Sequence, residues 1–160
     1  MLTRTALVLI AVMAFPALAF SAESAWFDMN KCAMCQPLMQ TPGLMEGISH
    51  EQLPLSKGVV TVTSVSDQHL KAYRQARAQM EGIVERVKKG ENVPLCGSCT
   101  AIFQLMPKGV EQDFVETKHG DVWILTSGNP AVAAELQAWA KRNNEEMANM
   151  MSATKKPAKM

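Results

Sequence analysis

The sequence predicts an α+β fold: a small sheet of about three strands, covered by helices in a ferredoxin-like or split βαβ-like arrangement. The observations behind this are a β-branched run at Gly58–Val65, a long amphipathic stretch after it, and a hairpin pattern at 110–127. One strand followed by a helix, and one hairpin followed by another helix, gives a sheet of one strand plus a hairpin with helices packed against it.

The first strand and the helix after it have the clearest patterns in the chain. Valine and threonine fill every position from Val59 to Val65 except Ser64, and β-branched residues favour strands. Ser66 or Asp67 is the expected N-cap of the following helix, which ends near Gly90. Its apolar residues are three and four apart, the spacing of one helical face. They are Leu70, Tyr73, Met80, Ile83, Val84 and Val87.

The remaining elements are assigned from the proline, glycine and turn residues at their ends. A short helix is expected from Ser98 to Met106, where proline and glycine follow it. Strands at 110–117 and 122–127 flank a turn at 118–121, in which Gly120 supplies a positive φ. Pro130 is at the favoured first position of a final helix. The apolar stripe of this helix is Val132, Leu136, Trp139, Met147, and Met150 or Met151.

The N-terminal region has fewer regular patterns. Asn30 is expected to cap a helical turn covering Cys32–Met39, and the stretch from His50 to Lys57, which contains Pro54, reads as a loop. The chain therefore divides into a cleavable signal peptide at 1–19, an N-terminal CxxC segment and loop at 20–57, an α+β core at 58–151, and a disordered tail at 152–160.

The first residues have the pattern of a secretory signal. Arg4 precedes an unbroken apolar run, Ala6–Phe15, and Ala17–Ala19 has the small residues that signal peptidase requires. The run is shorter than the ~20 residues that a membrane-spanning helix needs. We therefore expect a periplasmic or secreted protein with no membrane association after cleavage.

Charge excludes one class of partner. Arg4 is the only charged residue of the expected signal, so residues 20–160 carry no formal net charge. A neutral chain has no electrostatic basis for binding nucleic acid. Hydrolase-type clusters and glycine-rich phosphate loops are also missing from the sequence, so we do not expect an enzyme of these classes.

All four cysteines of the chain occur in two CxxC pairs, Cys32–Cys35 and Cys96–Cys99. A CxxC pair brings two sulfurs to the same side of a turn, and two pairs complete a tetrahedral thiolate shell. Over these eight residues the chain resembles tetrathiolate zinc knuckles. We therefore predict a metal site formed by all four cysteines, in which zinc or Cu(I) is structural or is handled as cargo.

Other interpretations of the cysteines stay open. Cross-paired disulfides would close loops of about 65 residues, of which the first bridge is worth roughly 4 kcal/mol in the entropy model, and would give a disulfide-stapled periplasmic binding or interaction domain. Cys96-Gly97-Ser98-Cys99 also fits a thiol-disulfide oxidoreductase, although no strand precedes it as in thioredoxins. Haem attachment is excluded because Gln36 and Thr100 follow the pairs where histidine is required.

Methionine content brings Cu(I) into consideration. The chain has 12 methionines, and soft sulfur ligands select Cu(I). Met34, inside the first pair, is the one methionine whose position fits ligation better than packing, so we add it as a candidate ligand. His50 is a weaker candidate as an auxiliary ligand, and another periplasmic protein is a candidate partner.

Overall fold

The computed structural model of the protein describes residues 25–154. The expected signal at 1–19, and residues 155–160 of the expected tail, lie outside this range. The α+β class is confirmed, but the sheet has four strands rather than about three. The strands are β1 (Ile48–Leu55), β2 (Gly58–Val65), β3 (Glu111–Thr117) and β4 (Gly120–Thr126). The α-helices are α1 (Gln36–Met39), α2 (Leu70–Lys88), α3 (Gly97–Leu105) and α4 (Pro130–Thr154).

The additional strand is β1, which occupies the stretch expected to be a loop. It pairs with β2 along its full length, from Ile48 opposite Val65 to Leu55 opposite Gly58. Pro54 argued against a strand because proline cannot donate a ladder hydrogen bond. β1 lies at the edge of the sheet and has only β2 as a neighbour, and an edge strand tolerates proline.

The strand order is β1-β2-β4-β3, and all neighbouring strands are antiparallel. Because β2 and β3 are both antiparallel to β4, they run parallel to each other with β4 between them. The connection from β2 to β3 contains α2 and α3, which makes a split βαβ unit. A ferredoxin-like domain would add its fourth strand after the last helix, whereas here β1 precedes the unit.

Gly120 has the expected positive φ, but it lies in a strand and not in the turn. The turn between β3 and β4 is at Lys118–His119, and Gly120 is the first residue of β4, with a φ of 146°. A Cβ at this position would lie 2.0 Å from the carbonyl oxygen of Thr63 on β2. Glycine is therefore needed both for its backbone conformation and for the close approach of two strands.

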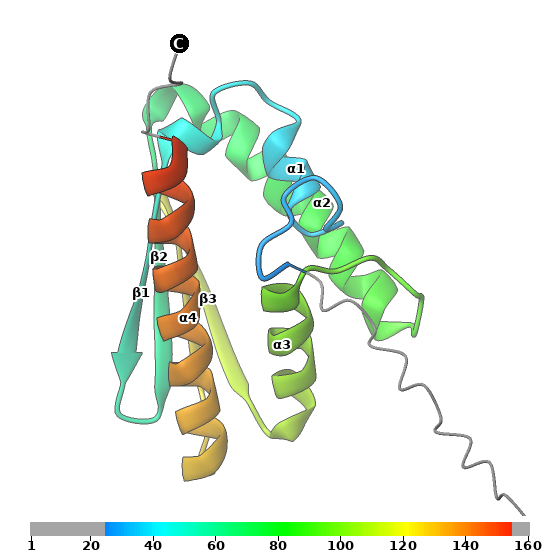
Figure 1. Cartoon of the computed structure of the whole chain (residues 1–160), viewed down its shortest axis with the longest axis vertical. Coiled ribbons are helices and arrows are strands. Elements are labelled where there is room, and N and C mark those ends of the chain that lie inside the picture. Colours follow the sequence, from blue (N-terminus) through cyan, green and yellow to red (C-terminus); the bar gives the residue numbers. More distant parts are fainter. Residues whose placement is uncertain (1–24, 155–160) are drawn as a thin grey trace, which may run out of the picture.

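The helices pack against one face of the sheet. α4 lies along β1 and β2 and contacts α3, which is beside it in Figure 1. One core cluster fills the space between the sheet, α3 and α4; it contains Val59, Ile102, Leu105, Leu125, Leu136, Trp139 and Ala140. A second cluster joins α2 to the N-terminal segment and contains Leu44, Val65, Tyr73 and Ala76.

The opposite face of the sheet carries Val60, Val62, Val122 and Ile124, because side chains alternate along a strand. Leu53 and Val115 at its margins are 42% and 51% exposed. The helices among residues 25–154 include none with the length and apolar character needed to cross a membrane.

Candidate metal centre

The second CxxC pair is built into the start of α3. Cys96 is the N-cap residue, in an extended conformation, and Cys99 is in the first helical turn. The first amide groups of a helix have no partner within the helix. Here the amides of Gly97 and Ser98 donate to the carbonyl oxygens of Ala25 and Trp26, at 3.0 and 2.9 Å. The N-terminal segment therefore caps α3 and is fixed beside the second pair.

Gly97 allows this close approach. A Cβ on Gly97 would lie 3.1 Å from Cε3 of Trp26 and 3.2 Å from its Cα. The Cα is a backbone atom and cannot move away without shifting the segment. The close packing of Trp26 thus explains why glycine occupies this position in the second pair.

The first pair is in a turn that immediately precedes α1. The amide of Cys32 donates to the carbonyl of Asp28 at 2.9 Å, and that of Cys35 donates to the carbonyl of Cys32 at 3.0 Å. The side chain of Asp28 accepts from the amide of Lys31, so Asp28, and not Asn30 as expected, stabilises this turn. The amide of Ala33 donates to the carbonyl of Pro94 at 2.9 Å, which joins the turn to the chain preceding the second pair.

These contacts bring the four cysteines together. Their Sγ atoms all lie within 4.8 Å of one another, and none of the four forms a disulfide in this structure. A tetrahedral shell with Zn–S near 2.3 Å separates its sulfurs by about 3.8 Å, which is compatible with this upper limit on their spacing. Cys32 and Cys96 are each 1% exposed and Cys35 is 9% exposed, while Cys99 is partly exposed. The four cysteines can therefore hold a metal ion that is shielded from solvent on most sides.

Hydrogen bonds among the thiols lower the pKa of two of them and raise the pKa of the other two. The bond with Cys35 is the main cause that lowers the pKa of Cys32 to about 6. Bonds with Cys32, Cys35 and Cys99 hold the pKa of Cys96 far below its usual range. Bonds with Cys32, together with burial, raise the pKa values of Cys35 and Cys99. Four crowded sulfurs cannot all be thiolates unless a cation is present, and a bound metal ion deprotonates its thiol ligands.

The surroundings of the cysteines are apolar. Met29, Met34 and Leu95 pack against the cluster. Met34 is half-buried beside the sulfurs, and its role as a ligand stays a prediction. His50 lies on β1, where its Nδ1 is 3.4 Å from Oγ1 of Thr63. It does not belong to the group of side chains that could hold a metal.

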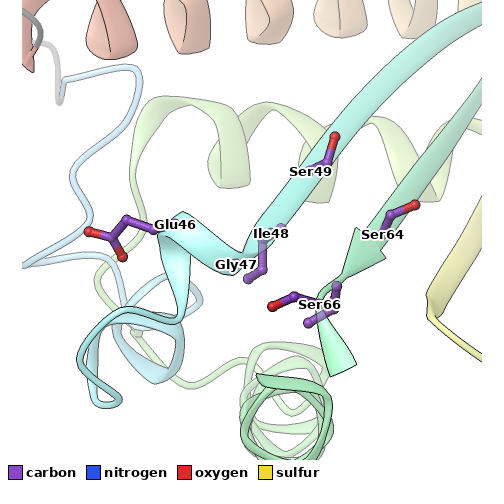
Figure 2. A pocket seen from close by; sticks show the side chains of 7 residues that line it. Glu46, Gly47, Ile48, Ser49, Ser64 and Ser66 are labelled. Carbon is purple, nitrogen blue, oxygen red and sulfur yellow. The ribbon is translucent and has the colours of Figure 1, made fainter. Parts of the chain in front are cut away.

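The open hollow shown in Figure 2 is separate from the cysteines. It has a volume of about 310 Å³ and is lined by Glu46, Gly47, Ile48, Ser49, Ser64, Val65 and Ser66. These residues come from the 3-10 turn at Met45–Gly47, the start of β1, the end of β2 and the residue after it, and Glu46 is the only charged one among them. The hollow thus adds no ligand to the metal centre.

Comparison with protein-family models, with curated proteins and with solved structures gives no match for this chain. The function therefore has to be argued from the geometry of the site itself.

One residue next to the site was missed by the sequence reasoning. Asn143 is 5% exposed on α4 and accepts a hydrogen bond from Ser98, inside the second pair. It continues the apolar stripe of Val132, Leu136 and Trp139 at a spacing of four. The sequence signal for Asn143 was an amide side chain on the apolar face of the last helix, because buried polar groups require hydrogen-bond partners.

Proposed function

We propose that this protein is an exported metal-binding protein in which Cys32, Cys35, Cys96 and Cys99 hold one zinc or Cu(I) ion. The observation that carries the proposal is the approach of all four Sγ atoms within 4.8 Å of one another, from two distant chain segments. One metal ion is bound by all four thiols together, whereas a single thiol at any of these positions would be an ordinary side chain.

The ion would act first as a structural link. It would join residues 25–47, which carry only a four-residue α-helix, to the start of α3. Because thiolate ligands are assembled only in the folded state, the free energy of metal binding contributes to the free energy of folding. We therefore expect the metal-free protein to be less stable than the metal-bound protein.

Metal handling is the second form of this proposal. Cys99 is the least buried of the four cysteines, and Met29 and Met34 add thioether sulfur around the site. Soft sulfur donors favour Cu(I), and a partly exposed ligand gives an incoming thiol access to the ion. The partner would then be another periplasmic protein that exchanges the metal, in the compartment that the N-terminal sequence predicts.

Disulfide stapling is the main alternative, because the proposed compartment is oxidising. Oxidoreductase chemistry is less well supported. The lowered pKa values of Cys32 and Cys96 favour this chemistry. Free amides at a helix N-terminus also activate a CxxC thiol, but here the amides of Gly97 and Ser98 already donate to carbonyl groups.

Alkylation of the purified native protein separates these alternatives. Thiols that hold a metal should be protected from iodoacetamide until a chelator is added, and should then react at all four positions. The fully denatured, reduced protein is the control for complete labelling. Thiols that react only after reductant, with no effect of chelator, would show a disulfide-stapled domain and refute the metal site.

A further inference from the structure

A line of polar side chains crosses the interior of the molecule beside the metal centre. Gln52 on β1, Thr61 on β2, Ser98 on α3 and Asn143 on α4 are between 3% and 5% exposed. They come from four different elements and lie next to an apolar core. Burying polar groups is unfavourable unless each one is hydrogen-bonded.

Each member of the line has a partner of the correct kind. Asn143 Oδ1 accepts from Trp26 Nε1 and from Ser98 Oγ, both at 2.8 Å. Asn143 Nδ2 donates to Gln52 Oε1 at 2.9 Å, and Gln52 Nε2 donates to Thr61 Oγ1 at 3.1 Å. Rotating the Asn143 amide by 180° would set its Nδ2 against the Trp26 Nε1 donor and its Oδ1 against the Gln52 Oε1 acceptor. The carbonyl of Asn143 is therefore fixed toward the two segments that carry the cysteines.

Both partners of this carbonyl are part of those segments. Ser98 lies between Gly97 and Cys99, and its own carbonyl accepts from Trp139 Nε1 at 3.1 Å. Trp26 precedes the first pair, and its ring lies 3.8 Å from the guanidinium carbon of Arg142. Two consecutive residues of α4, Arg142 and Asn143, thus hold Trp26, and Asn143 holds Ser98 as well.

We propose that Asn143 is a positioning residue of the metal centre, which sets the separation of the two CxxC pairs through Trp26 and Ser98. The proposal rests on the metal-binding function proposed above. Residues that orient metal ligands typically change metal affinity by about 10–100-fold when they are replaced. The effect follows because a carbonyl that anchors Trp26 and Ser98 holds the segments of the two pairs near each other before the metal binds.

The test uses Asn143→Leu, which keeps the approximate size of the side chain and removes the carbonyl. Ser98→Ala is the milder second variant, because it removes one hydrogen bond and leaves Trp26 paired. Asn144→Ala is the matched control, because Asn144 Nδ2 donates to the backbone carbonyl of Gln52 on β1 at 2.8 Å and not to Trp26 or Ser98. Zinc affinity is measured by chelator competition, and site geometry by the visible absorption of the Co(II)-substituted full-length mature protein.

We expect zinc affinity to fall by about 10–100-fold in Asn143→Leu and by less in Ser98→Ala. The control should stay within about twofold of the wild type, as substitutions away from a site usually do. The Co(II) absorption should change shape in both test variants, which lowered stability alone would not produce. Wild-type affinity and an unchanged Co(II) spectrum in Ser98→Ala and in folded Asn143→Leu would overturn the positioning role. Failure of the wild type to bind zinc, Co(II) and Cu(I) would instead refute the proposed function.

Discussion

The two CxxC pairs reach the same site from different kinds of structure. The second pair begins α3, a nine-residue helix whose Ile102 and Leu105 belong to the main core. The first pair is in a segment, residues 25–47, whose regular structure is limited to α1 and one short 3-10 turn. Core packing therefore positions the second pair directly. The turn that carries the first pair is held by its own hydrogen bonds, by the packing of Trp26 and Leu44 on either side of it, and by an ion bound to the sulfurs.

This difference indicates how the site would assemble. The second pair would already have its native arrangement in the metal-free protein, because core packing holds α3 in place. The turn that carries the first pair would close over it when the ion binds, while Trp26 stays anchored to Asn143, so that ordering of this turn is coupled to metal binding. The predictions below test this division of roles.

The largest effect is expected from removing a ligand from either pair. Cys96→Ser and Cys32→Ser should each lower zinc affinity by more than about 100-fold, because substitutions outside the ligand shell already cause losses of 10–100-fold. Chelator competition measures the affinity. A pair whose substitution leaves zinc affinity unchanged would not belong to the site.

Hydrogen exchange should separate the two pairs. After chelation, the amides of Cys32, Ala33 and Cys35 should exchange at least tenfold faster, because their hydrogen bonds lie within residues 25–47 or tie them to Pro94. The amides at the end of α3 should stay protected. Equal loss of protection in both regions, measured by mass spectrometry, would mean that the whole fold depends on the metal.

Gly97→Ala tests the contact between the segments. Its Cβ would crowd the Cα of Trp26, so the free energy of unfolding should fall by about 1–3 kcal/mol, as overpacking usually causes. Gly82→Ala is the control, because a Cβ there meets no atom within 4 Å and alanine favours the interior of α2. Chemical denaturation should show a lower free energy of unfolding for Gly97→Ala and a higher one for Gly82→Ala. An unchanged free energy of unfolding in Gly97→Ala would mean that Trp26 moves freely.

Met34→Leu should have the smallest effect on zinc. Leucine fills nearly the same volume, so zinc affinity should change by less than about threefold, in line with volume-conserving substitutions. Cu(I) affinity should fall more strongly if the thioether is a ligand. Met39→Leu, at a residue that is 46% exposed, is the control. Equal Cu(I) affinities in both variants would remove Met34 from the ligand set.

Much of the core could be predicted from local patterns. The β-branched run gave β2, the three-and-four spacing gave α2, and Pro130 marked the start of α4. β1 could not be predicted in this way, because Gln52 and His50 replace apolar residues on its inner side and Pro54 interrupts it. Its stability comes from pairing with β2 and from side-chain partners on α4, which are contacts between distant residues.

The cysteine site was predictable as a set, because two CxxC pairs with no cysteine left over indicate joint use. The approach of the sulfurs was not, since it depends on long-range contacts such as the caps that Ala25 and Trp26 provide for α3. The expected helical turn over Cys32–Met39 is correspondingly shorter, with α1 starting only at Gln36. Asn143 was missed because its role appears only when α4 is placed against α3 and β1.

Native mass spectrometry of the protein purified from its own compartment, without added metal or reductant, tests the central claim most directly. The metal-binding account predicts one zinc or copper ion for each chain, with a mass that shows all four cysteines without disulfides. A metal-free chain that is four hydrogens lighter than the fully reduced protein would have two disulfides, and would contradict the account.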